Sequence, residues 1–187
     1  RIGFIQREFT DGSIKNERTN IGNAKIYGWE SFINFNIDEI LKINNILKIN
    51  LFINNSLINS NYYNSIENGV EGNRVEFAPK INFKTGLNIS YKKINTNIQS
   101  TYLSSQFTDA SNSINSDLSG VIGIIPSYTV LDLSFSYIDK RFKFEASINN
   151  ILNDYYFTKR ATGYPGPGII PALNRNYTFT LQYIINE

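Results

Sequence analysis

The sequence predicts an all-β protein, in the form of part of a transmembrane antiparallel β-barrel. Apolar and polar residues alternate along several segments, which is the pattern of strands with one apolar and one polar face. These segments are longer than the five or six residues typical of soluble sheets and fit tilted membrane strands of about 9–11 residues. Short and long connections also alternate, as they do in outer-membrane barrels.

Eight strands are predicted in chain order. The first is a shortened strand over residues 1–9, and alternation predicts the others over 28–37, 47–54, 81–92, 94–102, 131–137, 142–148 and 177–183. Within 81–92, for example, Ile81, Phe83 and Leu87 alternate with polar neighbours. A helix would scatter these side chains around its axis, because a period of two places successive ones about 200° apart.

The connections suggest two different ends of the sheet. Short turns are expected near residues 38–45, 92–93 and 139–141, although 38–45 also fits a short helical turn. Long segments are expected over 9–25, 60–80, 104–127 and 160–174. All five prolines fall in or beside these long segments, which agrees with the strand predictions because proline cannot donate to a strand ladder.

Composition excludes several classes of site. The 187 residues include no Cys and no His, so neither a Cys-based zinc site nor a Ser-His-Asp triad is available, and no cofactor is predicted. Lys and Arg exceed Asp and Glu by only 18 to 16, so nothing favours nucleic acid as a partner. The 27 Asn and 29 Ile residues are interpreted as a coding bias without functional meaning. The chain does not begin with Met, so we expect a processed protein or a fragment.

Aromatic residues lie near the predicted strand ends, where a membrane barrel carries interfacial girdles. They are Tyr91, Tyr102, Tyr137, Phe142, Tyr155, Tyr156, Tyr177 and Tyr183. A soluble β-sandwich, such as a carbohydrate-binding module, would show the same alternation and remains an alternative.

Three segments carry a resemblance to a known family. Residues 149–156, Asn-Asn-Ile-Leu-Asn-Asp-Tyr-Tyr, resemble the "NNLFD-x-x-Y" segment of TonB-dependent outer-membrane receptors. Residues 128–134 are similar to the "y-x-x-x-D-L-s" strand that precedes it, and residues 20–30 to the "N-x-G-x-x-x-x-x-G-x-E" stretch. The resemblance implies that 1–187 is the C-terminal part of the β-barrel domain, about the last eight of 22 strands. It places the plug domain and the TonB-contacting segment outside this chain.

A narrower resemblance concerns the ligand. Residues 160–171, followed by 175–177, look like the last outer loop of ferric citrate (iron(III) dicitrate) receptors, and 107–110 and 123–128 fit the same subgroup. The implied function is energy-coupled uptake of a ferric chelate across the bacterial outer membrane, with another ferric siderophore as the alternative ligand. The implied partners are the TonB complex, outer-membrane lipid and lipopolysaccharide, and no enzymatic activity is expected. One departure is that residues 184–187 follow Tyr183, whereas the family's barrels usually end in an aromatic residue.

An anionic chelate calls for cationic donors, and Arg suits carboxylates because its planar fork binds them in bidentate fashion. The expected ligand-binding residues are Arg74, Arg160, Tyr164 and Arg175. The alternative for each arginine is that it anchors a loop or faces lipopolysaccharide phosphates.

Charged residues on the polar faces are predicted to line the barrel lumen. They are Glu30, Lys48, Lys84, Asp132, Lys143 and Glu145. Asp132 and Glu145 could in principle act as an acid–base pair, but pairing with lumen cations or with the plug is preferred.

A rival hypothesis is a complete eight-stranded barrel with a structural or adhesive role. It requires residues 1–9 to pair with residues 175–185. A fragment would instead have two open edges and is predicted not to insert alone, because unpaired backbone groups are costly in lipid.

Overall fold

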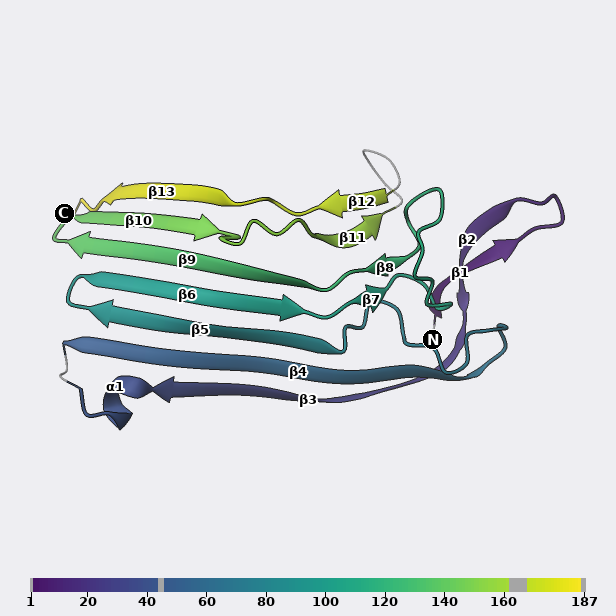
Figure 1. The fold of residues 1–187 in the computed structure, drawn as a ribbon, viewed down its shortest axis with the longest axis horizontal. Helices are drawn as coiled ribbons and strands as arrows, with labels where there is room; N and C mark the ends of the chain where they lie inside the picture. Colours follow the sequence, from purple (N-terminus) through teal and green to yellow (C-terminus); the bar gives the residue numbers. More distant parts are fainter. Residues whose placement is uncertain (1, 44–45, 162–167, 186–187) are drawn as a thin grey trace.

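The computed structural model of the chain describes residues 2–43, 46–161 and 168–185. Its main element is a seven-stranded antiparallel sheet in the order β13-β10-β9-β6-β5-β4-β3, which we call the wall sheet (Figure 1). This confirms the predicted fold class. The strands are β3 (Gly22–Asn36), β4 (Leu47–Ser65), β5 (Ile81–Tyr91), β6 (Ile94–Leu103), β9 (Tyr128–Asp139), β10 (Phe142–Asn149) and β13 (Asn176–Tyr183).

Three two-stranded sheets lie beyond one end of the wall sheet, which we call the loop end (Figure 1). They are β1 (Ile2–Glu8) with β2 (Ile14–Asn20), β7 (Gln106–Phe107) with β8 (Ile124–Ile125), and β11 (Phe157–Ala161) with β12 (Gly168–Pro171). The opposite end, the turn end, has tight connections and the short helix α1 (Ile37–Ile40). Among the described residues, no helix has the length and apolarity needed to cross a membrane.

The prediction that residues 1–9 form a wall strand is wrong. β1 pairs instead with β2, from Ile2↔Asn20 to Glu8↔Ile14. The physical reason is a tight turn at Gly12, whose φ of 77° favours glycine. This turn brings β2 back alongside β1, so the two strands form a hairpin of their own. The wall sheet therefore has seven strands. The small-barrel hypothesis requires β1 to pair with β13, and within the described residues the two strands are not paired.

Two wall strands extend further than predicted. β3 begins at Gly22 and β4 continues to Ser65, inside the segments 9–25 and 60–80 that were expected to be loops. Asparagines interrupt the apolar pattern here, but the ladder continues, with Lys25 opposite Asn61 and Tyr27 opposite Asn59. A side-chain bond from Asn59 Nδ2 to the Tyr27 hydroxyl (2.8 Å) supports the pairing.

The strand register divides the wall sheet into an apolar face and a polar face. One row of paired positions across all seven strands is entirely apolar: Phe35, Leu51, Leu87, Ile98, Leu133, Ile148 and Tyr177. The neighbouring row, on the other face, is entirely polar: Asn36, Asn50, Asn88, Asn97, Ser134, Ser147 and Thr178.

The asparagines of the polar face have a structural role that composition did not predict. Asn50 donates to Asn36 (2.9 Å), and Asn97 donates to Asn88 on the adjacent strand. Ser147 and Thr178 continue the pattern at 2.7 Å. Polar side chains thus satisfy one another across the strands, so asparagine is tolerated in strands despite its poor intrinsic propensity.

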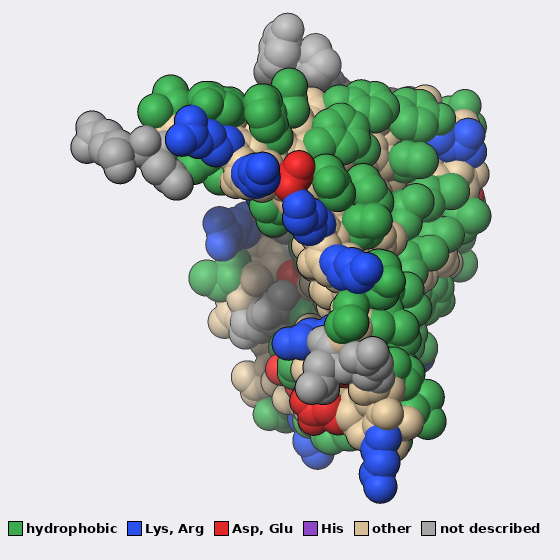
Figure 2. Space-filling view, turned by 90° about the vertical axis from the view of Figure 1, so that its left-hand side faces the viewer, with side chains coloured by type: hydrophobic (Ala, Val, Ile, Leu, Met, Phe, Trp, Pro, Cys, Tyr) green, Lys and Arg blue, Asp and Glu red, His purple; other side chains and the backbone are tan. Residues whose placement is uncertain are grey.

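The apolar face is exposed instead of forming a core. Trp29, Phe179 and Leu181 expose 58%, 71% and 72% of their surfaces, and Figure 2 shows continuous hydrophobic side chains on one side of the sheet. The buried apolar cluster lies at the loop end and consists of Ile21, Tyr62, Val70, Val75 and Ala110. A soluble sandwich would bury its apolar face against a second sheet, and the described residues form no such layer over it.

Candidate functional site

Two of the motifs found in the sequence meet at the loop end of β9 and β10. The Asp132 Oδ1 of β9 accepts a hydrogen bond from the backbone N–H of Asn150 (2.9 Å). The rings of Tyr128 and Tyr156 stack with centroids 4.4 Å apart. The polar and aromatic positions of residues 128–134 and 149–156 therefore form one joint between the wall strands and the loop that follows β10.

Asn150 shapes this joint because it adopts a positive φ of 53° while only 2% of its surface is exposed. Its side-chain amide donates to the carbonyls of Asp154 (2.9 Å) and Leu173 (3.3 Å). Its Oδ1 accepts from the N–H of Asp154 (3.0 Å). Asn tolerates the left-handed region and can bond its own neighbours, so this residue type suits a buried turn that turns the chain away from the wall.

The third motif positions β3 against β4. A Cβ built at Gly28 would lie 2.2 Å from the Leu57 carbonyl oxygen, so only glycine allows this close approach of the two backbones. Glu30, two residues along the strand, accepts a hydrogen bond from the Ser56 hydroxyl (3.2 Å). The motif therefore fixes the β3–β4 ribbon that extends into the loop end.

Arg74 joins two loops. Its Nη2 donates to the carbonyls of Ala78 and Ser105, both at 3.1 Å, and its guanidinium lies 5.3 Å from the Phe107 ring centroid. Desolvation by burial lowers the pKa of Arg74 from its ordinary value. Its Nε is buried without a hydrogen-bond partner among the described residues, and such a donor is costly to leave unsatisfied.

Arg160 joins β11 to the long β7–β8 loop. Its Nη1 donates to the Gly120 carbonyl (2.8 Å), while Nε and Nη2 both donate to the Ile124 carbonyl (3.2 and 3.0 Å). The guanidinium also lies 5.1 Å from the Phe157 ring centroid. Desolvation lowers the pKa of Arg160, while Asp117 acts in the opposite direction.

Arg175 is the most exposed of the predicted arginines. Its backbone N–H donates to Asn153 Oδ1 (3.0 Å), and its Nη2 donates to the Ile151 carbonyl (2.5 Å). Arg74 and Arg160 therefore contact the beginning and the end of the same long segment between β6 and β9, although neither residue belongs to it. Arg175 instead contacts the turn at Asn150. Tyr164, the remaining predicted ligand-binding residue, lies outside the described residues.

Two asparagines connect the loops in ways that the sequence pattern did not indicate. Asn112 Oδ1 accepts from the Arg74 N–H (2.7 Å), and Asn112 Nδ2 donates back to the Arg74 carbonyl (2.8 Å). Asn73 Nδ2 donates to the Ala110 carbonyl (2.9 Å). In a chain with 27 asparagines, no local signal distinguishes these two from the others.

Hollows lie on both sides of Tyr156. One of about 320 Å³ is lined by residues that include Asp132, Tyr156 and Asn176. Another of about 260 Å³ is lined by Tyr155, Tyr156 and Phe157 together with residues of the β12 end. A larger hollow of about 530 Å³ covers the polar face across β5, β6, β9, β10 and β13, so this face of the sheet is concave.

The lumen carboxylates bond separately. Glu145 forms an ion pair with Lys143 (2.8 Å), whereas Asp132 accepts from the Asn150 backbone. No contact between Asp132 and Glu145 is found among the described residues. The same part of the chain contains no group of three or more His, Cys, Asp or Glu side chains that could hold a metal ion. The geometry does not assemble the acid–base pair that the sequence left open.

Comparison with known sequences identifies a family for this fold and motif set. The chain matches the family model described as TonB dependent receptor-like, beta-barrel, over residues 3–151. No curated protein sequence matches the chain.

Solved structures show the same fold. The chain is similar to the ferric citrate transporter FecA in its unliganded form, with 18% identity and a TM-score of 0.72 over 94% of this chain and 26% of that one. It is also similar to the ferric yersiniabactin uptake receptor FyuA from Yersinia pestis, with 17% identity and a TM-score of 0.67 over 89% of this chain and 24% of that one. The copper transporter OprC is similar as well, with 13% identity and a TM-score of 0.63 over 98% of this chain and 27% of that one. The chain therefore spans about a quarter of the length of each.

Proposed function

Because the chain belongs to the TonB-dependent receptor β-barrel family, we propose that it forms the C-terminal part of the barrel of an outer-membrane receptor importing a ferric chelate. In this proposal the plug, the TonB-contacting segment and the remaining strands of a 22-stranded barrel belong to other parts of the full-length protein. The apolar face contacts membrane lipid, including lipopolysaccharide, and the concave polar face lines the lumen.

The observation that supports this proposal most directly is the division of the wall sheet into two faces. An exposed apolar row and a hydrogen-bonded polar row lie on opposite faces of seven strands. That arrangement suits a wall between lipid and an aqueous lumen. The loops joined by Arg74 and Arg160 then lie on the outer side, where a ligand arrives.

We propose ferric citrate as the ligand. Two observations support it: the resemblance of residues 160–171, followed by 175–177, to the outer loop of ferric citrate receptors, and the structural similarity to FecA, a ferric citrate transporter. Among the four expected residues, Arg175 is proposed to contact the chelate, because it is exposed and its guanidinium makes a single hydrogen bond within the described part of the chain, to the Ile151 carbonyl. Arg74 and Arg160 have more of their donors bonded to loop carbonyls and are proposed to hold the loops around the ligand. Tyr164, the fourth expected residue, is proposed as a further contact with the chelate.

The test is uptake of radiolabelled ferric citrate by cells that lack their own ferric citrate receptor and produce the full-length protein. Uptake is expected to require TonB. Arg175→Ala should weaken ferric citrate binding roughly tenfold, the value of about one charge-assisted hydrogen bond. Lys159→Ala serves as the matched control, because Lys159 is an exposed cation of the same loop region. The ferric citrate assignment fails if the cells take up none of it at any concentration.

A second ligand class is supported by the similarity to FyuA, a ferric yersiniabactin uptake receptor. The same cells can be supplied with iron bound to other siderophores. Uptake of one of these without ferric citrate uptake would assign the protein to that ligand and retain the receptor function.

A further inference from the structure

The two tight turns at the turn end consist entirely of cations. Lys92 and Lys93 join β5 to β6, and Lys140 and Arg141 join β9 to β10. The turns are neighbours, because β6 pairs with β9 and the Ile138 N–H bonds to the Lys93 carbonyl (3.0 Å). We call these four residues the basic rim; Figure 2, which faces this end, shows Lys and Arg side chains bordering the hydrophobic face.

The backbone of both turns favours other residue types. Lys92 has a φ of 54° and Lys140 a φ of 50°, in the left-handed region that Gly, Asn and Asp occupy most easily. Asparagine is plentiful in this chain, yet neither turn uses it. Lysine at both positions therefore adds charge without serving the turn geometry.

Contacts direct two of the cations toward the apolar face. Lys92 Nζ lies 5.2 Å from the ring centroid of Tyr91, and Arg141 Nη1 donates to the Tyr183 hydroxyl (3.3 Å). By the strand register, Tyr91 and Tyr183 lie on the same face of the sheet as the apolar row. The Tyr183 ring packs on the Phe142 ring, with centroids 5.0 Å apart. Aromatic residues at such strand ends lie at headgroup level, so these cations lie at that depth as well.

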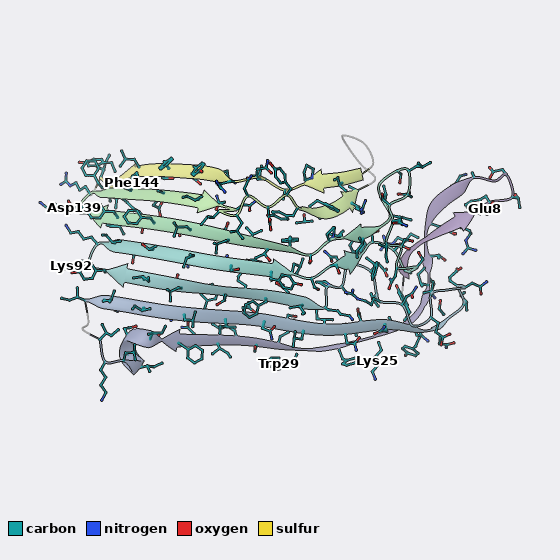
Figure 3. All side chains as sticks on the ribbon, viewed as in Figure 1. Glu8, Lys25, Trp29, Lys92, Asp139 and Phe144 are labelled. Carbon is teal, nitrogen blue, oxygen red and sulfur yellow. The ribbon has the colours of Figure 1, made fainter. Side chains whose placement is uncertain are left out.

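The nearby acids leave an excess of positive charge. Asp139 forms an ion pair with Lys93. Asp139 and Lys92 both lie at the turn end (Figure 3). Among the other acids near this end, Asp38 and Glu39 belong to α1, and Asp38 accepts the Ile49 N–H at 3.0 Å. Glu145 forms an ion pair with Lys143 on the polar face (2.8 Å). The rim's four cations thus face one paired carboxylate.

We propose that the basic rim binds the phosphate headgroups of anionic phospholipids in the inner leaflet of the outer membrane. This inference rests on the proposed function, which places the loop end outside and the turn end toward the periplasm. Clusters of Lys and Arg beside an apolar membrane surface attract anionic lipid, and the attraction is local because salt screens it within about 8–10 Å. Contact with the interfacial tyrosines favours lipid over an acidic periplasmic protein as the occupant.

The experiment uses the full-length protein in nanodiscs of equal parts phosphatidylglycerol and phosphatidylcholine, with retained lipids counted by native mass spectrometry. Phosphatidylglycerol should be retained roughly tenfold over phosphatidylcholine, and Lys92→Asn/Arg141→Gln should abolish most of that preference. Asn tolerates the turn conformation at residue 92, which limits folding defects. The charge-keeping variant Lys92→Arg/Arg141→Lys should restore the preference.

The matched control is Lys48→Gln/Lys143→Gln, which removes two cations from the same end but on the polar face. It should retain the lipid preference. Equal retention of both lipids by the unaltered protein overturns the proposal, and so does an equal loss in the control variant. Copurification of a periplasmic protein that depends on the rim, without lipid preference, would assign the rim to a protein partner instead.

Chelate binding measured on the same samples separates this inference from the proposed function. Lys92 and Arg141 lie at the opposite end from the loops, so their substitution should leave ferric citrate affinity unchanged. If the unaltered protein does not bind ferric citrate but still prefers phosphatidylglycerol, the result counts against the proposed chelate and not against the proposed lipid site.

Discussion

Arg160 illustrates how a residue expected to bind ligand can hold a loop in place. Its guanidinium donates to the carbonyls of Gly120 and Ile124, and Gly120 approaches Gly168 so closely that a Cβ there would lie 3.0 Å from the Gly168 Cα. The β7–β8 loop and the β11–β12 hairpin are therefore packed together. A Lys could replace the charge but not three donors in fixed geometry.

Arg160→Ala is predicted to open the β7–β8 loop, because two carbonyls lose charge-assisted bonds worth roughly 2–3 kcal/mol in local stability. Hydrogen exchange of residues 117–125 in the full-length protein should accelerate accordingly. Lys159→Ala, at the adjacent exposed position, should leave exchange unchanged. Unaltered protection in Arg160→Ala would exclude the anchoring role and leave ligand contact as the reason for this arginine.

Asp117 makes the same loop sensitive to acid. Desolvation raises the pKa of Asp117, but bonds from the Ser119 hydroxyl (2.5 Å) and the Ile122 N–H (3.1 Å) outweigh it and keep the pKa below its ordinary value. A depressed folded-state pKa stabilises the loop above the unfolded value of about 3.9 and ceases to do so as pH falls through the folded value. We predict that the Ile122 amide loses protection from hydrogen exchange as the pH falls from about 3.9 through the folded-state pKa of Asp117. Asp117→Asn, measured at each pH, should not show this loss. The same pH profile in both proteins would refute the prediction.

Within the wall sheet, Phe52 of β4 covers Gly86 of β5. A Cβ built at Gly86 would lie 2.5 Å from the Phe52 ring, and Thr85 Oγ1 donates to the Phe52 carbonyl (2.9 Å). Gly86→Ala is predicted to destabilise the full-length barrel by about 1–3 kcal/mol through overpacking. Phe52→Ala should remove that sensitivity, so a double-mutant cycle measured by urea unfolding in lipid should show strong coupling; additive effects would contradict the contact.

Leu133 and Ser134 are adjacent in β9 but lie on opposite faces of the sheet. Leu133→Arg should cost roughly 2–4 kcal/mol near the bilayer midplane, because it places a charge on the lipid face. Ser134→Arg adds the same charge to the polar face and should cost much less. Folding yield into vesicles distinguishes them, and equal yields would mean that the apolar face does not meet lipid.

At the level of elements, the sequence predicted wall strands β5, β6, β9, β10 and β13 within a few residues, because apolar and polar residues alternate cleanly there. It predicted β1 as a strand but not its pairing with β2, because the turn at Gly12 brings in a segment without clear alternation. It missed the loop-end parts of β3 and β4, where asparagines and charged residues conceal the period. The candidate arginines could be found from charge and loop position. Their partners could not, because backbone carbonyls such as those of Ser105 and Ile124 have no signature in sequence.

The molecule as a whole has two open edges. β3 pairs only with β4, and β13 pairs only with β10, so both outer rows of backbone groups lack strand partners within the described residues. We predict that the isolated 187-residue chain does not form a stable bilayer-spanning unit, because each unpaired group costs several kcal/mol in lipid. Heat-modifiable electrophoretic mobility of this chain in bilayers would contradict the prediction.

The β1–β2 hairpin projects from the loop end (Figure 1), and its turn at Gly12 has no atom within 4 Å of a Cβ built there. In the proposed orientation, this tip faces the outside of an intact cell, where antibodies and bacteriophages arrive. A peptide tag inserted beside Gly12 should therefore be displayed without disturbing the wall. The hairpin is thus predicted to be an accessible epitope among the described residues.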